Sequence, residues 1–343
     1  MKLLPYVLCG ALFSSHAYSL GEEGNDYQNF LDGGSRYLQD IGVDSSDSSA
    51  KTVHNNHYYY YNSPAIFAVI DSGVYSYHKD LTYVRDMSGK RHTHGTTVSA
   101  IVGATSNTIG YRGIVKPRRL YSILDNHRGS SVKQKSDMVK KVCHLLDIVN
   151  MSFLLSFETS YKKTKENFDF ESHVQSLSRF RTAFESCPTT LFVLAAGNSD
   201  VDAQKENGGI HYRYDSATDS IVYDPLDNVI VVGAHRNTSR PTQNYGKSVD
   251  IYAPENVAAA YKYSSSYKSN QLGTSFSAPQ VTGVAGLLCK MPSLCNDPEK
   301  MKEYILDKAD LETLVDSEGH ARPLLHAYKI VDKVDLDFRR TNI

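Results

Sequence analysis

Residues 273–283 read GTSFSAPQVTG, a short run of small and polar residues that opens an apolar stretch over Val281–Leu288. The pattern predicts a helix over about Ser275–Lys290. Backbone N–H groups at such a helix start point outward and can stabilise a negatively charged oxygen, so Ser275 is a candidate nucleophile. Serine is also a favoured helix N-cap, and Ser277 competes with Ser275 on spacing alone.

Two further short polar segments precede the serine segment along the chain, and we call all three polar islands. Asp71-Ser72-Gly73 directly follows the apolar run Ala65–Ile70, and His94-Gly95-Thr96 opens another apolar helical stretch. A half-buried carboxylate can orient an imidazole, and an imidazole is the natural general base near neutral pH. Each island alone is a common turn or surface pattern. Together, in the order Asp, His, Ser, they predict a site for nucleophilic catalysis.

Short apolar runs alternate with helical patterns along the chain. This alternation predicts an α/β fold with a mostly parallel central sheet and helices on both faces. Short apolar runs indicate strands at Ala65–Ile70, Ile148–Phe153, Leu191–Ala196, Asn228–Gly233 and Ser248–Ala253. Helical patterns lie at Lys133–Leu146, His173–Glu185 and Asp297–Lys308. Residues 155–172 lack clear periodicity and are expected to be a surface insertion. Sites of such sheets form beyond the carboxyl ends of the strands, which is where the islands stand.

Composition excludes several classes of protein. The 343 residues include 37 Lys+Arg and 38 Asp+Glu, a net charge of −1, so there is no electrostatic case for nucleic acid or an acidic membrane as partner. Hydrophobic residues make up 41% and charged residues 22%, which excludes a largely disordered chain and a polytopic membrane protein. We expect no stable membrane anchor. The oligomeric state is left open.

The first residues have the features of a secretory signal peptide. Residues 1–19 combine Lys2, an apolar run over Leu3–Phe13 and small residues around Ala17 and Ser19. A secreted location, extracellular or periplasmic, follows. Residues 20–63 are rich in Gly, Ser, Asp and Asn and are expected to be mainly loop or arm.

An even number of cysteines in an exported chain indicates disulfides. Cys9 would leave with the signal peptide, and the remaining cysteines allow three pairings. We favour Cys143 with Cys187 and Cys289 with Cys295, because the second pair encloses a short loop. Spacing and neighbours do not favour structural zinc.

The ordered islands resemble the motifs of the subtilisin-like serine peptidases, the subtilases. AVIDSG resembles the aspartate motif, HGTTVSAIVGA the histidine motif and GTSFSAPQVTG the serine motif, and GIVKP, DIVNMS, LAAGNS, NVIVVGA and NYGKSVDIYAP match in order. The resemblance covers about residues 64–332, the expected catalytic domain, and leaves residues 333–343 as a tail.

The resemblance implies a secreted serine endopeptidase that acts on protein or peptide substrates and requires no cofactor for catalysis. Asp71 would orient His94, His94 would act as general base and then acid, and Ser275 would be the nucleophile. Asn198 of LAAGNS would donate to the tetrahedral oxyanion together with the Ser275 backbone N–H.

The resemblance also implies the substrate-binding residues. These are Ser152, Phe153 and Leu154 after one strand, and Ala196 and Gly197 after another. Phe153, Leu154 and Leu155 stand where the family usually has glycines. We expect the leucine side chains to narrow or block the pocket and to restrict the substrate. Glu255 stands where a glycine is common.

A structural calcium site is a further implication of the resemblance. Asn107, with the carbonyls of Thr105, Ile109 and Tyr111, occupies the loop that binds calcium in many subtilases, and Asp80 matches its distant carboxylate. Oxygen-only ligands suit Ca²⁺.

Other interpretations remain open. The fold could serve a catalytically weak or inactive binding protein, or a toxin subunit, since residues 20–63 are too short for a full-sized prodomain. An α/β hydrolase is disfavoured, because its serine would precede the Asp and His. Asn237-Thr238-Ser239 forms a glycosylation sequon, which has meaning only in a eukaryotic secretory pathway.

Overall fold

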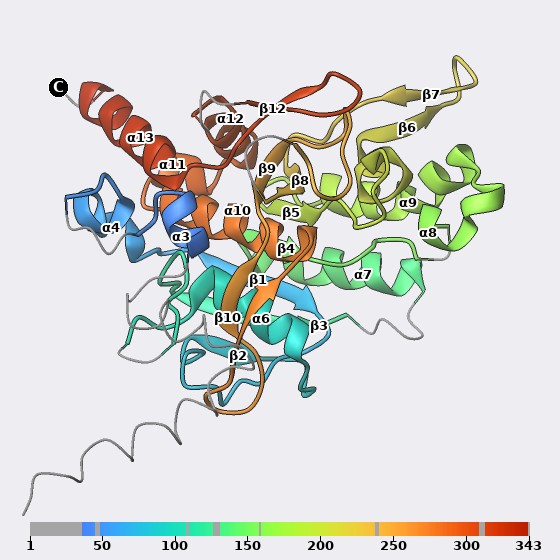
Figure 1. Cartoon of the computed structure of the whole chain (residues 1–343). Coiled ribbons are helices and arrows are strands. Elements are labelled where there is room, and N and C mark those ends of the chain that lie inside the picture. Colours follow the sequence, from blue (N-terminus) through green and yellow to red (C-terminus); the bar gives the residue numbers. More distant parts are fainter. Residues whose placement is uncertain are drawn as a thin grey trace, which may run out of the picture.

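The computed structural model describes residues 36–44, 49–107, 110–125, 131–157, 159–236, 240–308 and 313–341. The predicted signal peptide and the sequon at Asn237 lie outside these residues. A seven-stranded sheet forms the centre of the molecule, in the order β2-β3-β1-β4-β5-β8-β9, and its strand pairs are parallel. The predicted α/β fold with a mostly parallel sheet is confirmed (Figure 1).

The sheet strands are β1 (Ile66–Asp71), β2 (Val84–Asp86), β3 (Arg119–Leu124), β4 (Ile148–Met151), β5 (Leu191–Ala195), β8 (Val229–His235) and β9 (Ile251–Pro254). Antiparallel hairpins pair β6 (Tyr212–Asp215) with β7 (Ser220–Tyr223), β10 (Val257–Ala260) with β11 (Tyr267–Gln271), and β12 (Thr313–Val315) with β13 (Ala321–Pro323). Sequence patterning predicted neither the hairpins nor β2 and β3, because these strands are short or half-exposed.

The longer helices are α6 (Thr93–Gly103), α7 (Val132–Val142), α9 (Phe170–Glu185), α10 (Thr274–Leu288), α12 (Pro298–Lys308) and α13 (Ala327–Thr341). Shorter helical pieces are α3 (Arg36–Asp40), α4 (Val53–Asn56), α5 (Tyr58–Tyr61), α8 (Tyr161–Thr164), α11 (Pro292–Cys295), and the 3₁₀ turns Cys143–Leu145, Lys165–Asn167, Ala203–Lys205 and Asn207–His211. The α9 helix begins three residues before its predicted start, because Asp169 caps it by accepting the N–H groups of Glu171 and Ser172.

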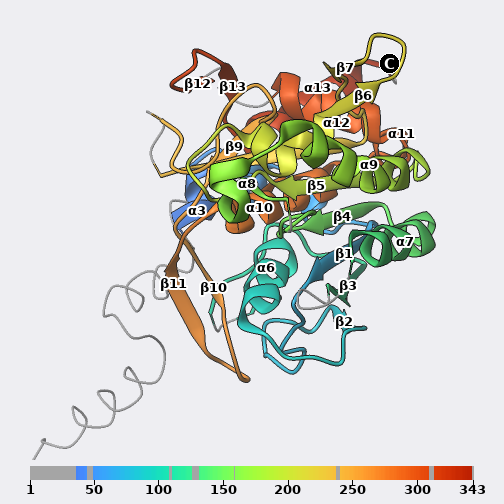
Figure 2. The same cartoon turned by 90° about the vertical axis from the view of Figure 1, so that its right-hand side faces the viewer.

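Strand β1 shows why its apolar run is continuous. Phe67 and Val69 face the hydrophobic cluster that contains α6 and α10, whereas Ala68 and Ile70 face the cluster that contains α7 and α9. Alternate side chains of one strand therefore fill two cores. Figure 2 shows α7 and α9 on one side of the strands and α6 and α10 on the other.

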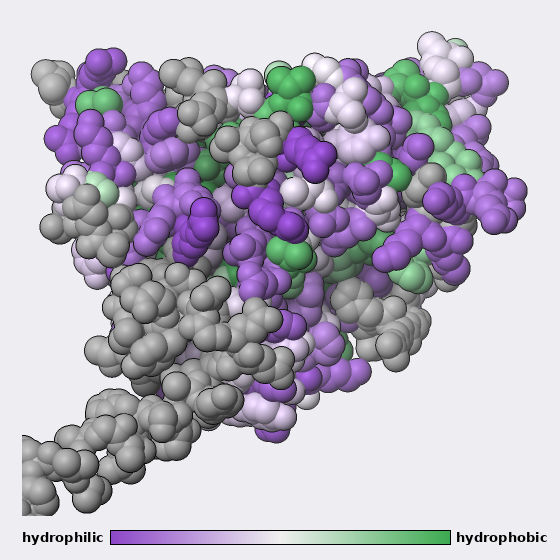
Figure 3. Space-filling model, viewed as in Figure 1, coloured by the Kyte–Doolittle hydropathy of each residue, from purple (hydrophilic) through white to green (hydrophobic). Residues whose placement is uncertain are grey.

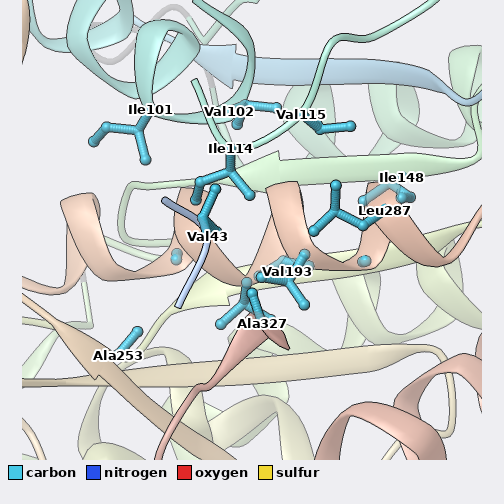
Figure 4. Packing of buried hydrophobic residues seen from close by; sticks show 14 of the residues in the cluster. Val43, Ile101, Val102, Ile114, Val115, Ile148, Val193, Ala253, Leu287 and Ala327 are labelled. Carbon is cyan, nitrogen blue, oxygen red and sulfur yellow. The ribbon is translucent and has the colours of Figure 1, made fainter. Parts of the chain in front are cut away.

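The α10 helix is buried along almost its whole length, and the predicted nucleophile Ser275 is the one residue of this helix that is not buried. Figure 4 shows its Leu287 near Ile148 and Val193 of the sheet, with Ile114 and Val115 from the segment before β3 close by. Such dense apolar packing fixes the start of the helix relative to the strand ends.

Part of the segment expected to be a loop or arm is helical and packed onto the body. Tyr60 and Tyr61 are buried, and the Tyr60 hydroxyl donates to Asp335 of α13 at 3.0 Å. His57 lies 3.0 Å from Asp332 of the same helix. Chain segments from both ends of the described region therefore lie side by side (Figure 1). The aromatic residues of this segment could have indicated that it packs onto the body, but the many Gly and Ser residues around them favoured a loop.

Both predicted disulfides are present. Cys143 is bonded to Cys187 and Cys289 to Cys295. The first ties the end of α7 to the loop before β5, and the second closes the turn after α10. The segment 155–172 is only partly a surface insertion: Leu155 is fully buried, whereas the turn Lys165–Asn167 buries no residue.

Figure 3 shows mainly hydrophilic residues on one face of the molecule, with hydrophobic residues scattered among them. Within the described ranges, no helix has both the length and the apolar character needed to span a bilayer.

Candidate active site

The predicted site residues meet at the carboxyl edge of the sheet because β1, β4 and β5 are neighbours in register. Ile70 pairs with Met151, and Met151 pairs with Leu194. Asp71, Ser152 and the Ala196–Asn198 segment therefore leave adjacent strands at the same level. The first turns of α6 and α10 bring His94 and Ser275 to this edge.

Asp71 and His94 are in direct contact. His94 Nδ1 lies 2.9 Å from each carboxylate oxygen of Asp71. Asp71 is fully buried, and its Oδ1 also accepts hydrogen bonds from the Ser72 N–H at 2.6 Å and the Ser72 hydroxyl at 2.8 Å. These donors hold the carboxylate in one orientation, and the carboxylate in turn holds the imidazole by its Nδ1.

A glycine after His94 is required by the close approach of the β1 end. A Cβ atom on Gly95 would lie 2.3 Å from the carbonyl oxygen of Gly73 and 3.1 Å from Asp71 Oδ1. Any larger residue would push α6 away from β1 and separate the imidazole from the carboxylate. The small residues in HGTT thus have a steric cause.

The electrostatics of the pair favour its charged forms. Burial opposes the imidazolium, but the charge and hydrogen bond of Asp71 outweigh it, so the pKa of His94 is raised. Burial likewise opposes the Asp71 carboxylate, but His94 and the Ser72 donors lower the pKa of Asp71. The carboxylate is thus set to stabilise a proton on the imidazole.

Ser275 stands in the first turn of α10 and is half-buried. Its hydroxyl donates to the Ser152 carbonyl at 3.2 Å, and the Ser152 hydroxyl donates back to the Ser275 carbonyl at 2.9 Å. The ring of the next residue, Phe276, lies 5.4 Å from the His94 ring. Within the described residues, the Ser275 hydroxyl thus donates to Ser152 and not to His94. Catalytic hydrogen bonds often tighten only when substrate binds.

Asn198 lies beside the start of α10 in an exposed position. Its side-chain oxygen accepts the Thr274 N–H at 2.9 Å and lies 3.0 Å from the Thr274 hydroxyl. Because Thr274 engages the amide oxygen, the amide nitrogen of Asn198 remains available as a donor. Thr274 also accepts the Gly197 N–H at 3.2 Å, so the two loops are joined on both sides.

Ser277, the competing nucleophile, is fully buried and donates to the Pro254 carbonyl at 3.1 Å. Its hydroxyl is held inside the protein, away from any substrate. Geometry therefore favours Ser275.

The expected substrate edge after β4 is anchored from behind by Asn207. The Asn207 side chain donates to the carbonyls of Phe153 and Ala195, both at 2.7 Å, and accepts the Leu155 N–H at 2.9 Å. It thereby joins the two segments expected to line the substrate pocket. Leu155 is fully buried in the core, so of the two leucines only the half-buried Leu154 can narrow an open pocket.

The predicted metal ligands Asp80 and Asn107 are also brought together. Asn107 donates its side-chain nitrogen to Asp80 Oδ1 at 3.0 Å, and the buried Asp80 Oδ2 makes no well-formed hydrogen bond within the described residues, although the Tyr267 hydroxyl and the Tyr111 N–H also lie against the carboxylate. Burial raises the pKa of Asp80 to about 6. A buried carboxylate oxygen of this kind favours a cation or a proton, so the pair fits the expected calcium ligands. The Ile109 carbonyl lies outside the described residues.

Several residues that shape the site were missed in the sequence. Asn207 and Glu206 belong to the stretch between β5 and β6, where polar residues follow one another without periodicity. Thr274 lies inside the serine motif, but nothing in the pattern showed that its hydroxyl faces Asn198. Glu255 was visible only as a departure from a common glycine.

The chain is similar to known proteins in sequence and in fold. The model of the subtilase family matches residues 40–327. Subtilisin DY of Bacillus licheniformis is 29% identical over 240 residues, which cover 66% of this chain and 77% of that protein. Alkaline protease 1 of Aspergillus flavus is 25% identical over 278 residues, which cover 76% of this chain and 60% of that protein.

Solved structures support the fold. A crystal structure described as a lanthipeptide protease superposes with a TM-score of 0.63 at 19% identity, covering 91% of this chain and 97% of that one. The family match extends over more than half of the chain and includes each of the three motifs. The chain belongs to the subtilase family of serine endopeptidases.

Proposed function

We propose that Asp71, His94 and Ser275 form the catalytic triad of a secreted serine endopeptidase. The observation that supports this most strongly is the buried Asp71 carboxylate 2.9 Å from His94 Nδ1, beside the helix start that carries Ser275. This arrangement fixes the imidazole with its other nitrogen available as a base.

In the proposed mechanism, Ser275 Oγ attacks the carbonyl carbon of the scissile peptide bond and gives its proton to His94 Nε2. Asp71 stabilises the resulting imidazolium. His94 then protonates the leaving amine, which departs and leaves an acyl-enzyme. Water, deprotonated by His94, attacks the ester and restores the Ser275 hydroxyl.

The negative oxygen of each tetrahedral intermediate would be held by the Asn198 side-chain nitrogen and the Ser275 backbone N–H. The bonds from Thr274 to Asn198 Oδ1 support this role, because they engage the amide oxygen and leave the amide nitrogen to donate. One such donor contributes about 10²–10³ in turnover in enzymes of this type.

Substrate binding requires the Ser275 hydroxyl to leave the Ser152 carbonyl. Rotation about the Cα–Cβ bond of Ser275 would do this and would release Oγ for proton transfer to His94. The Ser152 carbonyl then becomes available to accept a backbone N–H of the substrate, as the corresponding edge does in the family. Binding of substrate and assembly of the triad would be coupled by this exchange.

We further propose a restricted specificity, with Ser152, Phe153, Leu154, Ala196 and Gly197 lining the substrate site. The half-buried Leu154 at a position usually held by glycine supports this. Structures described as a leader-peptide-processing protease and a leader peptidase share the fold, which is thus compatible with limited processing. Efficient cleavage of denatured casein at many sites would contradict the restriction.

Asp80 and Asn107 are proposed ligands of a structural Ca²⁺, together with the carbonyls of Thr105 and Tyr111. When bound, the ion would neutralise the buried Asp80 carboxylate and tie the loop after α6 to the segment after β1. It would take no part in peptide hydrolysis.

Mass-spectrometric mapping of cut sites in a peptide library tests the proposed function. We expect cleavage by the wild-type protein and by Ser277→Ala, a matched control in the same helix, and none by Ser275→Ala. Equal cleavage by wild type and Ser275→Ala would refute the triad. Absence of cleavage in all three would instead favour the binding-protein or toxin-subunit alternatives.

A further inference from the structure

Two buried glutamates lie behind the proposed oxyanion site, one against each of its loops. Glu206 is 2% exposed and Glu255 is 3% exposed. The proposed mechanism uses neither of them. Burying a carboxylate is costly unless several donors satisfy it, so the position of each one needs a reason.

Glu206 supports the loop that carries Asn198. Its Oε1 accepts the Ser199 hydroxyl at 2.7 Å. Burial raises the pKa of Glu206, and hydrogen bonds from Ser199, Asn244 and the Asn198 backbone N–H oppose this rise. A Cβ atom on Gly197 would lie only 1.9 Å from Glu206 Oε2, so the loop rests directly on the carboxylate.

Asn244 completes this support. It donates to Glu206 Oε2 at 2.9 Å and to the Ala196 carbonyl at 3.1 Å, and its side-chain oxygen accepts the Ser199 N–H at 2.9 Å. The residues on both sides of Asn198 are thus held by one buried polar pair. Asn198 itself stays exposed.

Glu255 supports the loop that carries Ser275. Its Oε2 accepts the Gly273 N–H at 2.8 Å, and its Oε1 accepts a hydrogen bond from Arg236 at 2.9 Å. Gly273 has φ 114° and ψ 162°, a backbone conformation that favours glycine. The carboxylate therefore holds the unusual turn that sets the direction of the following Ser275 N–H.

The two loops meet where Thr274 bonds to Asn198 and Gly197. The two proposed oxyanion donors consequently belong to separately supported segments. Their spacing depends on both glutamates, because a shift of either loop moves one donor relative to the other. Displacements of about 1 Å in such constellations can cost about 10²-fold in rate.

We propose that Glu206 and Glu255 are positioning residues of the oxyanion site, Glu206 acting through Asn198 and Glu255 acting through Gly273 and the Ser275 N–H. The inference rests on the proposed function. It predicts an effect on turnover with little effect on substrate binding, because the oxyanion exists only after attack.

Kinetics of Glu206→Gln and Glu255→Gln, which keep side-chain size, test the proposal. We expect each to lower kcat about 10-fold to 100-fold with KM unchanged. The matched control is Asp250→Asn, a largely buried carboxylate bonded to His211 and Lys302 away from both loops. It should lower thermal stability and leave kcat of the folded enzyme unchanged. If a Gln variant does not fold, Glu→Asp at the same position retains the charge and withdraws it by one methylene.

A double-mutant cycle with Asn198→Ala separates positioning from general structural damage. Glu206→Gln should cost nothing further in the Asn198→Ala background, because the donor that it positions is gone. Glu255→Gln should keep its full effect there. The proposal would be overturned if the fold losses in kcat of Glu206→Gln and Asn198→Ala multiplied in the double variant. It would also be overturned if the single variants kept the wild-type kcat, or if they raised KM in place of lowering kcat. If the wild-type protein were inactive, the proposed function itself would be overturned. If the wild-type protein were active and the variants gave any of these contrary results, only the inference about Glu206 and Glu255 would be overturned.

Discussion

His94 Nδ1 lies 2.9 Å from both carboxylate oxygens of the buried Asp71, so one ring nitrogen is engaged and the other is directed to the site. Replacement of Asp71 by Asn places an amide where the carboxylate accepts the hydrogen bond from the His94 Nδ1–H. The wrong tautomer of His94 is then favoured, and the imidazolium loses its counter-charge.

We expect Asp71→Asn to lower kcat by about 10⁴-fold with the fold intact. Steady-state hydrolysis of a peptide cleaved by the wild-type protein measures this. Retention of more than a tenth of the activity would show that Asp71 is not the orienting carboxylate.

The pH dependence of activity follows from the raised pKa of His94. Only the neutral imidazole accepts a proton, and a raised pKa keeps the ring protonated to higher pH. The acid limb of the kcat/KM profile should therefore lie above the ordinary histidine value of about 6.5. In Asp71→Asn the limb should move to lower pH, because burial of the ring then acts without the opposing carboxylate. An acid limb that does not move between the two proteins would contradict this account.

Calcium should stabilise the protein most at neutral pH. The folded-state pKa of Asp80 is about 6, above its ordinary value of 3.8, so the ion-free folded state binds this proton more tightly than the unfolded chain. The contribution of Asp80 to stability therefore falls as pH rises from about 4 to about 6. Above that range the carboxylate is charged, and Ca²⁺ at 100 times its Kd would add about 2.7 kcal/mol.

Thermal unfolding with and without Ca²⁺, at pH 5 and pH 7.5, measures this effect. The calcium-dependent rise in Tm should be larger at pH 7.5 and should vanish in Asp80→Asn. If the calcium-dependent rise in Tm were equally large in Asp80→Asn, the ion would have to bind at another site.

The two disulfides should differ in their contribution to stability. Cys143–Cys187 closes a sequence separation of 44 residues and Cys289–Cys295 one of 6. Chain-entropy arguments give about 4 kcal/mol for the longer loop and about 2 kcal/mol for the shorter one. Urea unfolding of the two paired Cys→Ser variants should show the larger loss for Cys143/Cys187. The reverse order would mean that restriction of the unfolded chain is not the main effect.

Much of the fold was predictable because its central strands are buried on both faces. Ala65–Ile70 and Leu191–Ala196 stand out as apolar runs, and both are sheet strands within one residue of the expected bounds. The half-exposed β3 has no such run and the hairpin strands are very short, so sequence patterning overlooked them. The packed tyrosines of α5 were hidden by the polar composition around them.

The candidate site was predictable to the extent that its residues are local. The motifs indicated Asp71, His94 and Ser275 because each directly follows or opens an apolar element. Glu206, Asn207 and Asn244 could not be found this way, because their roles depend on hydrogen bonds between segments far apart in the chain. Such contacts produce no periodic pattern of apolar and polar residues in the sequence.

Labelling with a fluorophosphonate probe tests the central claim most directly, since only a serine activated by a neighbouring base reacts rapidly. The labelled peptide is then identified by mass spectrometry. The account predicts modification at Ser275 in the wild-type protein, none in Ser275→Ala, and strongly reduced labelling in His94→Ala. Labelling at another serine, or equal labelling of wild type and His94→Ala, would contradict it.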